Sequence, residues 1–337
     1  MRVIITTPTD SPHGGVRVIL EWANRLSENF SVGLLPLKGH VFGWFGPLSC
    51  DVVSSPAGAD LLILTSPHDV HLLDYPCKKV LFLQMLEHLF RPHDQAWLKQ
   101  CMRFYMAPYP MISISAWNIE WLKQAGRPDV EYYVGNGVNF DQFPKEQKDH
   151  DNPVVLVEGL QPGNPSKDAS RQAWRVARAL MREGVTVTGY GMKALHGISI
   201  NGEYIVKPSL EDMNRLYREA SLMLKASIYD ARSCAPMEAL SKCTPTVRAI
   251  NKGDDDLRDG FNCVKMRYGN SAAMLKAAKE LLSDHERRRQ LGINGLSVLP
   301  SWEVIMSGIR KIIEHEGSVH SGYGVPGAGV GGDKRGN

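Results

Sequence analysis

The sequence lacks closely spaced cysteines. No C-x-x-C pair occurs, which excludes zinc ribbons and thioredoxin-like redox motifs. The six cysteines are Cys50, Cys77, Cys101, Cys234, Cys243 and Cys263. Because they lie far apart, we expect them to be reduced thiols in a cytoplasmic protein.

Long apolar runs are also absent. No run approaches the roughly 18 residues of a membrane span. The chain begins with Met1 and Arg2, followed by the short apolar run Val3–Ile5 and then polar residues, so no apolar signal core with a cleavage site is present. These features predict a soluble cytoplasmic protein without a transmembrane segment.

The chain has little excess charge, with 39 Lys and Arg against 36 Asp and Glu, a net charge of +3. This balance is too mild to indicate nucleic-acid binding by itself. A composition of 43% hydrophobic and 22% charged residues excludes collagen-like and disordered chains. A length of 337 residues predicts about two domains.

Short apolar runs alternate with helical patterns, which is typical of βαβ units around a parallel sheet. The expected strands are 3–6, 32–35, 61–64, 80–83 and 111–114, then 154–157, 185–188, 222–226 and 246–250. Helices are expected at 16–26, 169–183, 210–220, 236–242, 271–283 and 302–315. The sequence therefore predicts an α/β fold of two Rossmann-like domains, whose strand ends face each other across a cleft.

Polar and proline-rich composition places the domain boundaries. We predict an N-terminal domain over 1–143 and a linker over 144–153. A second domain over 154–300 is followed by a C-terminal helix, 301–316, and a flexible Gly-rich tail, 317–337.

The segment 227–240 is the most informative for chemistry. Asp230 precedes a loop of small residues, and Glu238 lies just inside the following helix, where Pro236 suits the first helical position. Loop amides at a helix N-terminus can hold a phosphate, and flanking carboxylates can hold sugar hydroxyls. The alternative from spacing alone is that Glu238 merely complements the helix dipole and that Asp230 is an ordinary loop residue.

This segment resembles the retaining GT-B glycosyltransferases of the group-1, family 4-like type. Their Glu, seven residues, Glu-Ala pattern corresponds to Asp230 and Glu238-Ala239. Further landmarks follow in the same order over about residues 3 to 315. They are Gly14-Gly15 before a helix, Gln84 to Phe90, Ser113 to Leu122, and Gly135 to Asn139 with Phe143.

The resemblance implies a nucleotide-diphosphate sugar as co-substrate, with no other cofactor and no metal. Glu238 would hold the donor ribose, and Asp230 the transferred sugar. Lys167 would hold the diphosphate. Amides in the loop of Ser233, Cys234 and Ala235 would assist.

The resemblance also implies roles for the first domain. The backbone of the Gly14-Gly15 turn would approach the donor, and Glu87 and His88 would face it from the acceptor side. Asp230 replaces the family's usual Glu, and the usual arginine before the lysine is absent. We expect Arg171, from the following helix, to take that arginine's place.

One predicted helix carries arginines at steps of four, three and four residues: Arg171, Arg175, Arg178 and Arg182. Like charges at this spacing repel by a few tenths of a kcal/mol per pair, about 0.2–0.5. Such a stripe could follow a polyanion such as DNA. The alternative is a solvated face balanced by nearby acids.

Two other motifs formally match known ligand-binding patterns, but we do not expect them to bind a ligand. Gly189 to Ala194 formally fits a dinucleotide-binding fingerprint, but it follows the second strand of its domain. Asp254-Asp255-Asp256 contains a D-x-D pattern, which we interpret as a solvated turn rather than a metal site.

We therefore predict a metal-independent, retaining hexosyl- or pentosyltransferase. The expected acceptor is a saccharide or a lipid-linked saccharide. One alternative is glycosylation of a hydroxymethylated base in DNA, and another is a non-catalytic sugar-nucleotide binding module.

Overall fold

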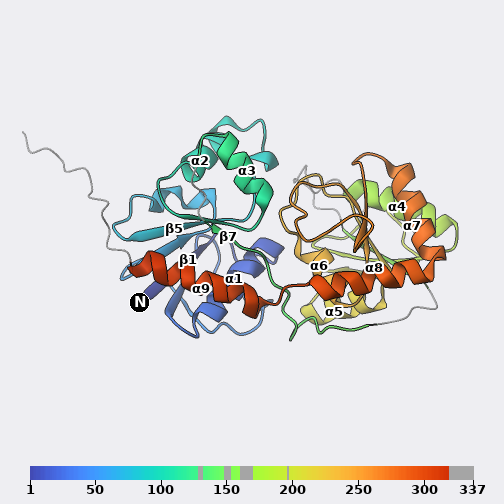
Figure 1. The fold of residues 1–337 in the computed structure, drawn as a ribbon, viewed down its shortest axis with the longest axis horizontal. Coiled ribbons are helices and arrows are strands. Elements are labelled where there is room, and N and C mark those ends of the chain that lie inside the picture. The colour runs from blue at the N-terminus through green and yellow to red at the C-terminus, as the bar shows by residue number, and fades with distance from the viewer. Residues whose placement is uncertain (128–131, 148–152, 160–169, 196, 319–337) are drawn as a thin grey trace, which may run out of the picture.

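A computed structural model of the chain describes residues 1–127, 132–147, 153–159, 170–195 and 197–318 (Figure 1). Lys167 lies outside the described residues, as do residues 148–152 of the predicted linker. Among the described residues, no helix is both long enough and apolar enough to cross a membrane.

The first domain is a doubly wound parallel sheet. Over the described residues it has seven strands, in the order β3-β2-β1-β4-β5-β6-β7. The strands are β1 (Arg2–Thr7), β2 (Ser31–Pro36), β3 (Asp51–Val52), β4 (Leu61–Leu64), β5 (Lys78–Leu83), β6 (Met111–Ser113) and β7 (Tyr132–Tyr133). The helices are α1 (Gly14–Leu26), α2 (Gln95–Tyr105) and α3 (Ala116–Gln124), with 3₁₀ turns η1 (Pro67–Leu72) and η2 (Glu87–Phe90).

The second domain repeats this topology. Its sheet, as far as it is described, has six parallel strands in the order β10-β9-β8-β11-β12-β13. They are β8 (Val154–Glu158), β9 (Thr186–Gly191), β10 (Tyr204–Val206), β11 (Leu222–Lys225), β12 (Thr246–Ala249) and β13 (Cys263–Met266). The helices are α4 (Ser170–Arg182), α5 (Leu210–Glu219), α6 (Cys234–Ser241), α7 (Ser271–Ser283) and α8 (His285–Val298).

The apolar pattern of the sequence predicts the central strands better than the edge strands. Every residue of the central strand β4 is fully buried, which is why it reads as a continuous apolar run. Four strands were not predicted: β3 and β7 in the first sheet, and β10 and β13 in the second. All four lie at sheet edges, where burial is incomplete and the apolar pattern is weak.

The last helix returns to the first domain. Helix α9 (Trp302–Ser318) packs against α1 and the first sheet through Trp302, Met306, Ile309 and Ile313 (Figure 1). It extends two residues beyond the predicted end at 316, so the predicted tail begins inside the helix, and residues 319–337 lie outside the described part.

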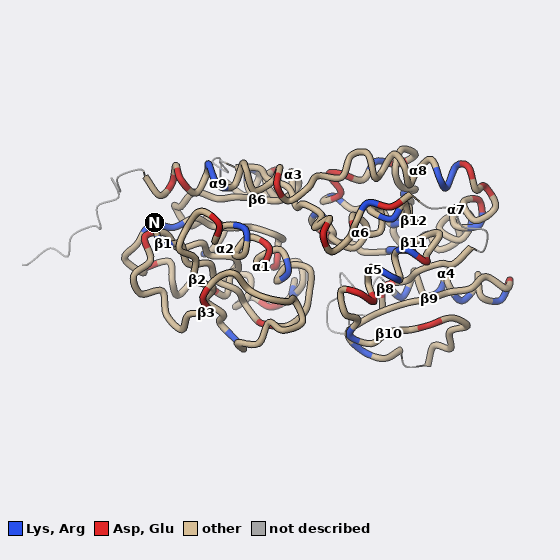
Figure 2. Tube along the Cα trace, turned by 90° about the horizontal axis from the view of Figure 1, so that it is seen from below, with Lys and Arg blue, Asp and Glu red and all other residues tan. Residues whose placement is uncertain are grey.

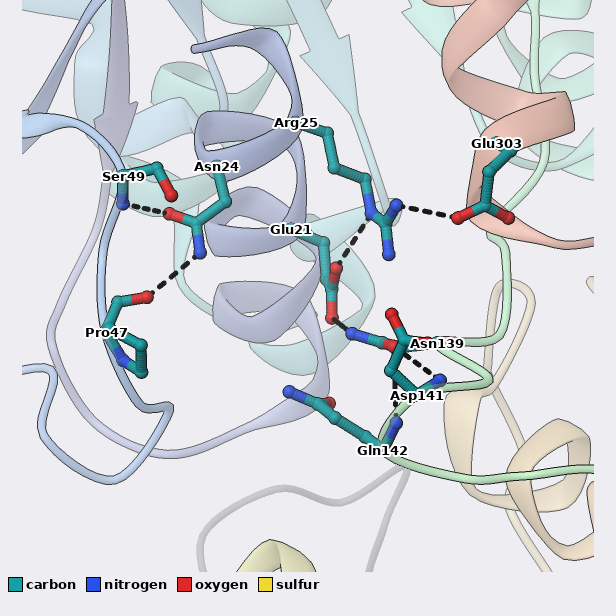
Figure 3. A network of polar contacts seen from close by, with 9 residues as sticks. All are labelled: Glu21, Asn24, Arg25, Pro47, Ser49, Asn139, Asp141, Gln142 and Glu303. Atoms are coloured by element: carbon teal, nitrogen blue, oxygen red, sulfur yellow. Dashed lines mark hydrogen bonds and ion pairs between the residues drawn. The ribbon is translucent and has the colours of Figure 1, made fainter. Parts of the chain in front are cut away.

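A polar network fixes the place where the chain passes between domains. The buried Glu21 of α1 accepts hydrogen bonds from Arg25 (3.1 Å) and from Nδ2 of Asn139 (2.8 Å), and Arg25 also pairs with Glu303 of α9 (2.9 Å) (Figure 3). Helix α1, the turn before the second domain and α9 are therefore joined at one point.

Candidate functional site

A large cleft of about 1010 Å³ lies between the two domains, at the carboxyl ends of both sheets. In doubly wound folds, this edge of the sheet is where ligands bind. Six of its lining residues illustrate the contribution of each domain: Gly15, Gln84 and Glu87 from the first, and Glu158, Asp230 and Glu238 from the second.

Most of the predicted site residues converge on this cleft. Those that line it are Gly14, Gly15, Glu87, Asp230, Ser233, Cys234, Ala235 and Glu238. A Cβ placed on Gly14 would lie 3.8 Å from Sγ of Cys234, so the glycine turn of α1 and the small-residue loop before α6 face each other closely.

Two predicted residues lie elsewhere. The His88 ring packs against Trp121 (4.6 Å between centroids) and Tyr105 (5.8 Å), and it is not among the residues lining the cleft. Arg171 lies on a separate groove along α4, so it does not supply the missing arginine within the cleft. The structure therefore places neither His88 nor Arg171 among the described residues that line the cleft.

The N-terminus of α6 opens into the cleft. The helix begins at Cys234, two residues earlier than predicted, and Pro236 therefore occupies its third position instead of its first. Its N-cap residue is Ser233, whose side chain makes no capping hydrogen bond. The amides of the first turn thus form a positive helix end suited to an anion.

Glu238 is the fifth of the eight residues of this helix, and its side chain is only 7% exposed. The guanidinium of Arg17 in α1 forms a salt bridge with it, and the Tyr217 hydroxyl donates a hydrogen bond to Oε2 (3.2 Å). Arg17 also lies over the Phe143 ring, 5.6 Å from its centroid. Sequence reasoning missed Arg17, because nothing in its own helix marks it as the partner of a distant carboxylate.

Asp230 belongs to a second charged group on the same side of the cleft. Lys225, at the end of β11, forms an ion pair with Glu158 at the end of β8, and its Nζ lies 3.5 Å from Oδ2 of Asp230. Burial lowers the pKa of Lys225, but the two carboxylates outweigh that effect and raise it overall. Lys225 was also missed, although a lysine inside an otherwise apolar strand is a usable signal.

On the first-domain side of the cleft, Glu87 has a carboxyl whose pKa is raised. Burial raises its pKa to about 8, so the group is largely protonated at neutral pH. The Ser66 hydroxyl lies within 3.5 Å of Oε2. A neutral carboxyl can donate as well as accept a hydrogen bond, which suits contact with a hydroxylated ligand.

The three aspartates 254–256 are not a solvated turn. Asp254 is buried against Arg248 (2.6 Å), and Asp256 pairs with Arg232 (2.6 Å). Asp255 accepts hydrogen bonds from the Tyr133 hydroxyl (3.0 Å) and the Ala116 amide (2.9 Å) of the first domain. Asp255 therefore links the two domains, whereas Asp254 and Asp256 pair within the second. The described part of the chain contains no group of three or more His, Cys, Asp or Glu residues placed to hold a metal.

The paired sheets, with their shared strand order and the cleft between them, define the GT-B fold. Similar solved structures include Anabaena HepE (Alr3699) in complex with UDP-glucose, with a TM-score of 0.73 and 16% identity over 94% of this chain and 100% of that one. Sucrose-phosphate synthase from Thermosynechococcus elongatus has a TM-score of 0.74 and 12% identity, over 93% and 98%. WaaG, a glycosyltransferase involved in lipopolysaccharide biosynthesis, has a TM-score of 0.67 and 10% identity, over 93% and 99%.

No protein-family model and no curated protein matches the sequence. The solved structures confirm the predicted fold.

Proposed function

We propose that the protein is a glycosyltransferase that moves a sugar from a nucleotide-diphosphate sugar to an acceptor hydroxyl. The observation that carries this proposal is the open N-terminus of α6, which faces the cleft between Asp230 and Glu238. A helix N-terminus suits a diphosphate, and carboxylates on either side suit the hydroxyls of the ribose and the sugar.

In this proposal the second domain binds the donor. Glu238 accepts hydrogen bonds from the ribose hydroxyls, and Asp230, held beside Lys225, accepts from the transferred sugar. Asp230 is one methylene shorter than the family's Glu, and the ammonium of Lys225 lies 3.5 Å from its Oδ2. We assign the diphosphate to the α6 amides and to Lys167.

We infer that the reaction retains the anomeric configuration and needs no metal. The acceptor oxygen would attack the anomeric carbon on the face from which the diphosphate departs. The carbon–oxygen bond to the diphosphate breaks, and the acceptor proton passes to the leaving phosphate oxygen. Amides and a lysine directed at that oxygen stabilise the charge that develops there.

The acceptor in this proposal enters along the first domain, past Gly15 and Glu87. A cleft of about 1010 Å³ is at the upper end of the range for small-molecule sites, which leaves room for an acceptor beside the donor. A saccharide or lipid-linked saccharide fits the neutral Glu87 carboxyl, which can hydrogen-bond to sugar hydroxyls.

Thermal unfolding in the presence of nucleotide sugars tests the donor site. UDP-glucose is the first probe, because HepE was crystallised with it, followed by GDP-, ADP- and dTDP-sugars. A ligand at 100 times its Kd should stabilise the protein by about 2.7 kcal/mol. Glu238→Ala should abolish the shift, whereas Glu286→Ala, whose side chain is 75% exposed on α8, should leave it unchanged.

Slow hydrolysis of the bound nucleotide sugar then separates an enzyme from a binding module. We expect released sugar with the wild-type protein and none with Asp230→Ala. Binding without any hydrolysis or transfer would favour the binding module. No stabilisation by any member of the panel would contradict the donor site itself.

A further inference from the structure

Helix α4 presents a basic face outside the cleft. Its four arginines are exposed and line one shallow groove together with Trp174 and Ile198. They are Arg171, Arg175, Arg178 and Arg182. This α4 arginine face has no lining residue in common with the cleft, and α4 lies on the side of the second domain away from the first (Figure 1).

The charge of this face is not balanced by its own helix. Helix α4 contains no Asp or Glu, and Figure 2 marks only basic residues along it. Glu183, which directly follows the helix, is paired with Lys279 of α7 (2.7 Å). The alternative of a face neutralised by nearby acids is therefore not supported at its C-terminal end.

Two of the arginines have no structural task in the described part of the chain. The Arg178 side chain donates a hydrogen bond to the Gly197 carbonyl (2.9 Å), but the side chains of Arg175 and Arg182 make no hydrogen bond or ion pair with another described residue. Like charges three and four residues apart destabilise a helix. The two guanidinium groups of Arg175 and Arg182, held in a repulsive row, indicate a ligand of opposite charge.

The geometry points to a phosphodiester chain: we propose that the α4 arginine face binds the backbone of nucleic acid. The helix rises about 1.5 Å per residue, so the row spans roughly 16 Å. One strand of duplex DNA carries a phosphate every 3.4 Å along its axis, so about five phosphates pass along this length. Guanidinium groups match phosphate oxygens in pairs, which a row of lysines would not do.

The groove on this face combines an aromatic floor with charged walls. The groove floor is the Trp174 ring, which is only 1% exposed and whose indole N–H donates to the Glu158 carbonyl (3.1 Å). Among the described residues, the arginines supply the charged side chains of the groove, and we assign their contacts to phosphate oxygens. The site is therefore an accessory surface that would keep the cleft near nucleic acid.

Fluorescence anisotropy with a labelled 20-base-pair duplex, without any nucleotide sugar, tests this proposal. We compare wild type with the double variant Arg175→Gln/Arg182→Gln between 25 and 200 mM salt. The matched control is Arg287→Gln/Arg289→Gln, which removes the same charge from exposed positions on α8. Loss of two phosphate contacts should reduce the slope of log Kd against log salt by about 1.8.

The control should change that slope by less than half as much, and Arg175→Lys/Arg182→Lys should preserve it because the charge remains. Equal binding by wild type and the α4 double variant would overturn the proposal. So would retention on phosphatidylserine vesicles, lost in the α4 double variant, with no DNA binding, since the face would then contact membranes. Donor binding in the cleft is measured separately, so neither result depends on the glycosyltransferase proposal.

Discussion

The two domains share one strand order but differ at the point where that order reverses. In the first domain, hydrogen bonds join the strands there: the Thr6 hydroxyl of β1 donates to the buried Asp69 (2.6 Å), and so does the Thr65 amide after β4 (2.7 Å). At the equivalent point of the second domain, Glu158 of β8 pairs with Lys225 of β11. The same topology thus surrounds a buried carboxyl with neutral donors in the first domain and pairs a carboxylate with a cation in the second.

This difference assigns roles that topology alone cannot. Glu87 faces the cleft from the first domain as a largely neutral carboxyl, since burial raises its pKa to about 8. Asp230 and Glu238 face it from the second domain beside cations. Under the proposed function, a diphosphate sugar needs charged and polar partners, so we assign the donor to the second domain and a neutral acceptor to the first.

The largest expected effect is the loss of stability on removing the Lys225 ammonium of the second domain. Lys225→Met leaves Glu158 and Asp230 as carboxylates without their buried partner, which should cost about 3–5 kcal/mol. Thr6→Val, at the equivalent point of the first domain, should cost about 1–3 kcal/mol, since the buried Asp69 loses one donor but keeps the amides of Thr65 and Ser66. Urea unfolding measures both, and Lys276→Met on the exposed face of α7 is the control. Equal losses in the free energy of unfolding for Lys225→Met and Thr6→Val would show that the charged and the neutral arrangement contribute equally to stability.

Arg17 of the first domain forms a salt bridge with Glu238 of the second. A double-mutant cycle with Arg17→Ala and Glu238→Ala should show a coupling free energy of about 1–3 kcal/mol. Because the two residues lie in different domains, the coupling should be lost in a variant whose domains separate. Additive effects of the two substitutions would show that the salt bridge does not link the domains.

The sequence predicted the central strands and the two-domain arrangement because buried parallel strands leave continuous apolar runs. It did not predict β3, β7, β10 and β13, since short edge strands are stabilised by one neighbour and need no such run. The loop before α6 was predicted with its carboxylates, because its residue types and spacing are local.

The partners of those carboxylates could not be predicted in the same way. Arg17 reaches Glu238 across 221 positions of sequence, and no local pattern encodes such a pairing. His88 follows the cleft residue Glu87 directly, yet the backbone of the 3₁₀ turn sends its ring toward Trp121. Asp254 and Asp256 look like a polar turn in sequence, and only the fold brings Arg248 and Arg232 to them.

The pH dependence of stability should sharpen the assignment of Glu87. Its pKa is raised from 4.5 to about 8, so the folded state binds a proton that the unfolded state has lost over this range. The stabilisation by protonated Glu87 is complete below pH 4.5 and declines as the pH rises toward 8, with a slope of at most about 1.4 kcal/mol per pH unit. Urea unfolding of wild type and Glu87→Gln at pH 5.5 to 8.5 isolates this contribution. Parallel curves would contradict the raised pKa.

The smallest expected effect concerns Gly15. Substitution by alanine should change helix stability and donor affinity in opposite directions. A Cβ there would lie 3.6 Å from Oε1 of Gln84, an ordinary contact, so Gly15→Ala should fold and gain up to about 1 kcal/mol from helix propensity. The methyl would nevertheless enter the cleft where the backbone meets the donor, and we expect several-fold weaker nucleotide-sugar binding. Gly308→Ala on α9, where a Cβ meets nothing within 4 Å, should give the same gain in stability with unchanged binding. Calorimetric titration with the donor measures the difference; equal affinities of both variants would show that the donor does not approach the glycine turn of the first domain.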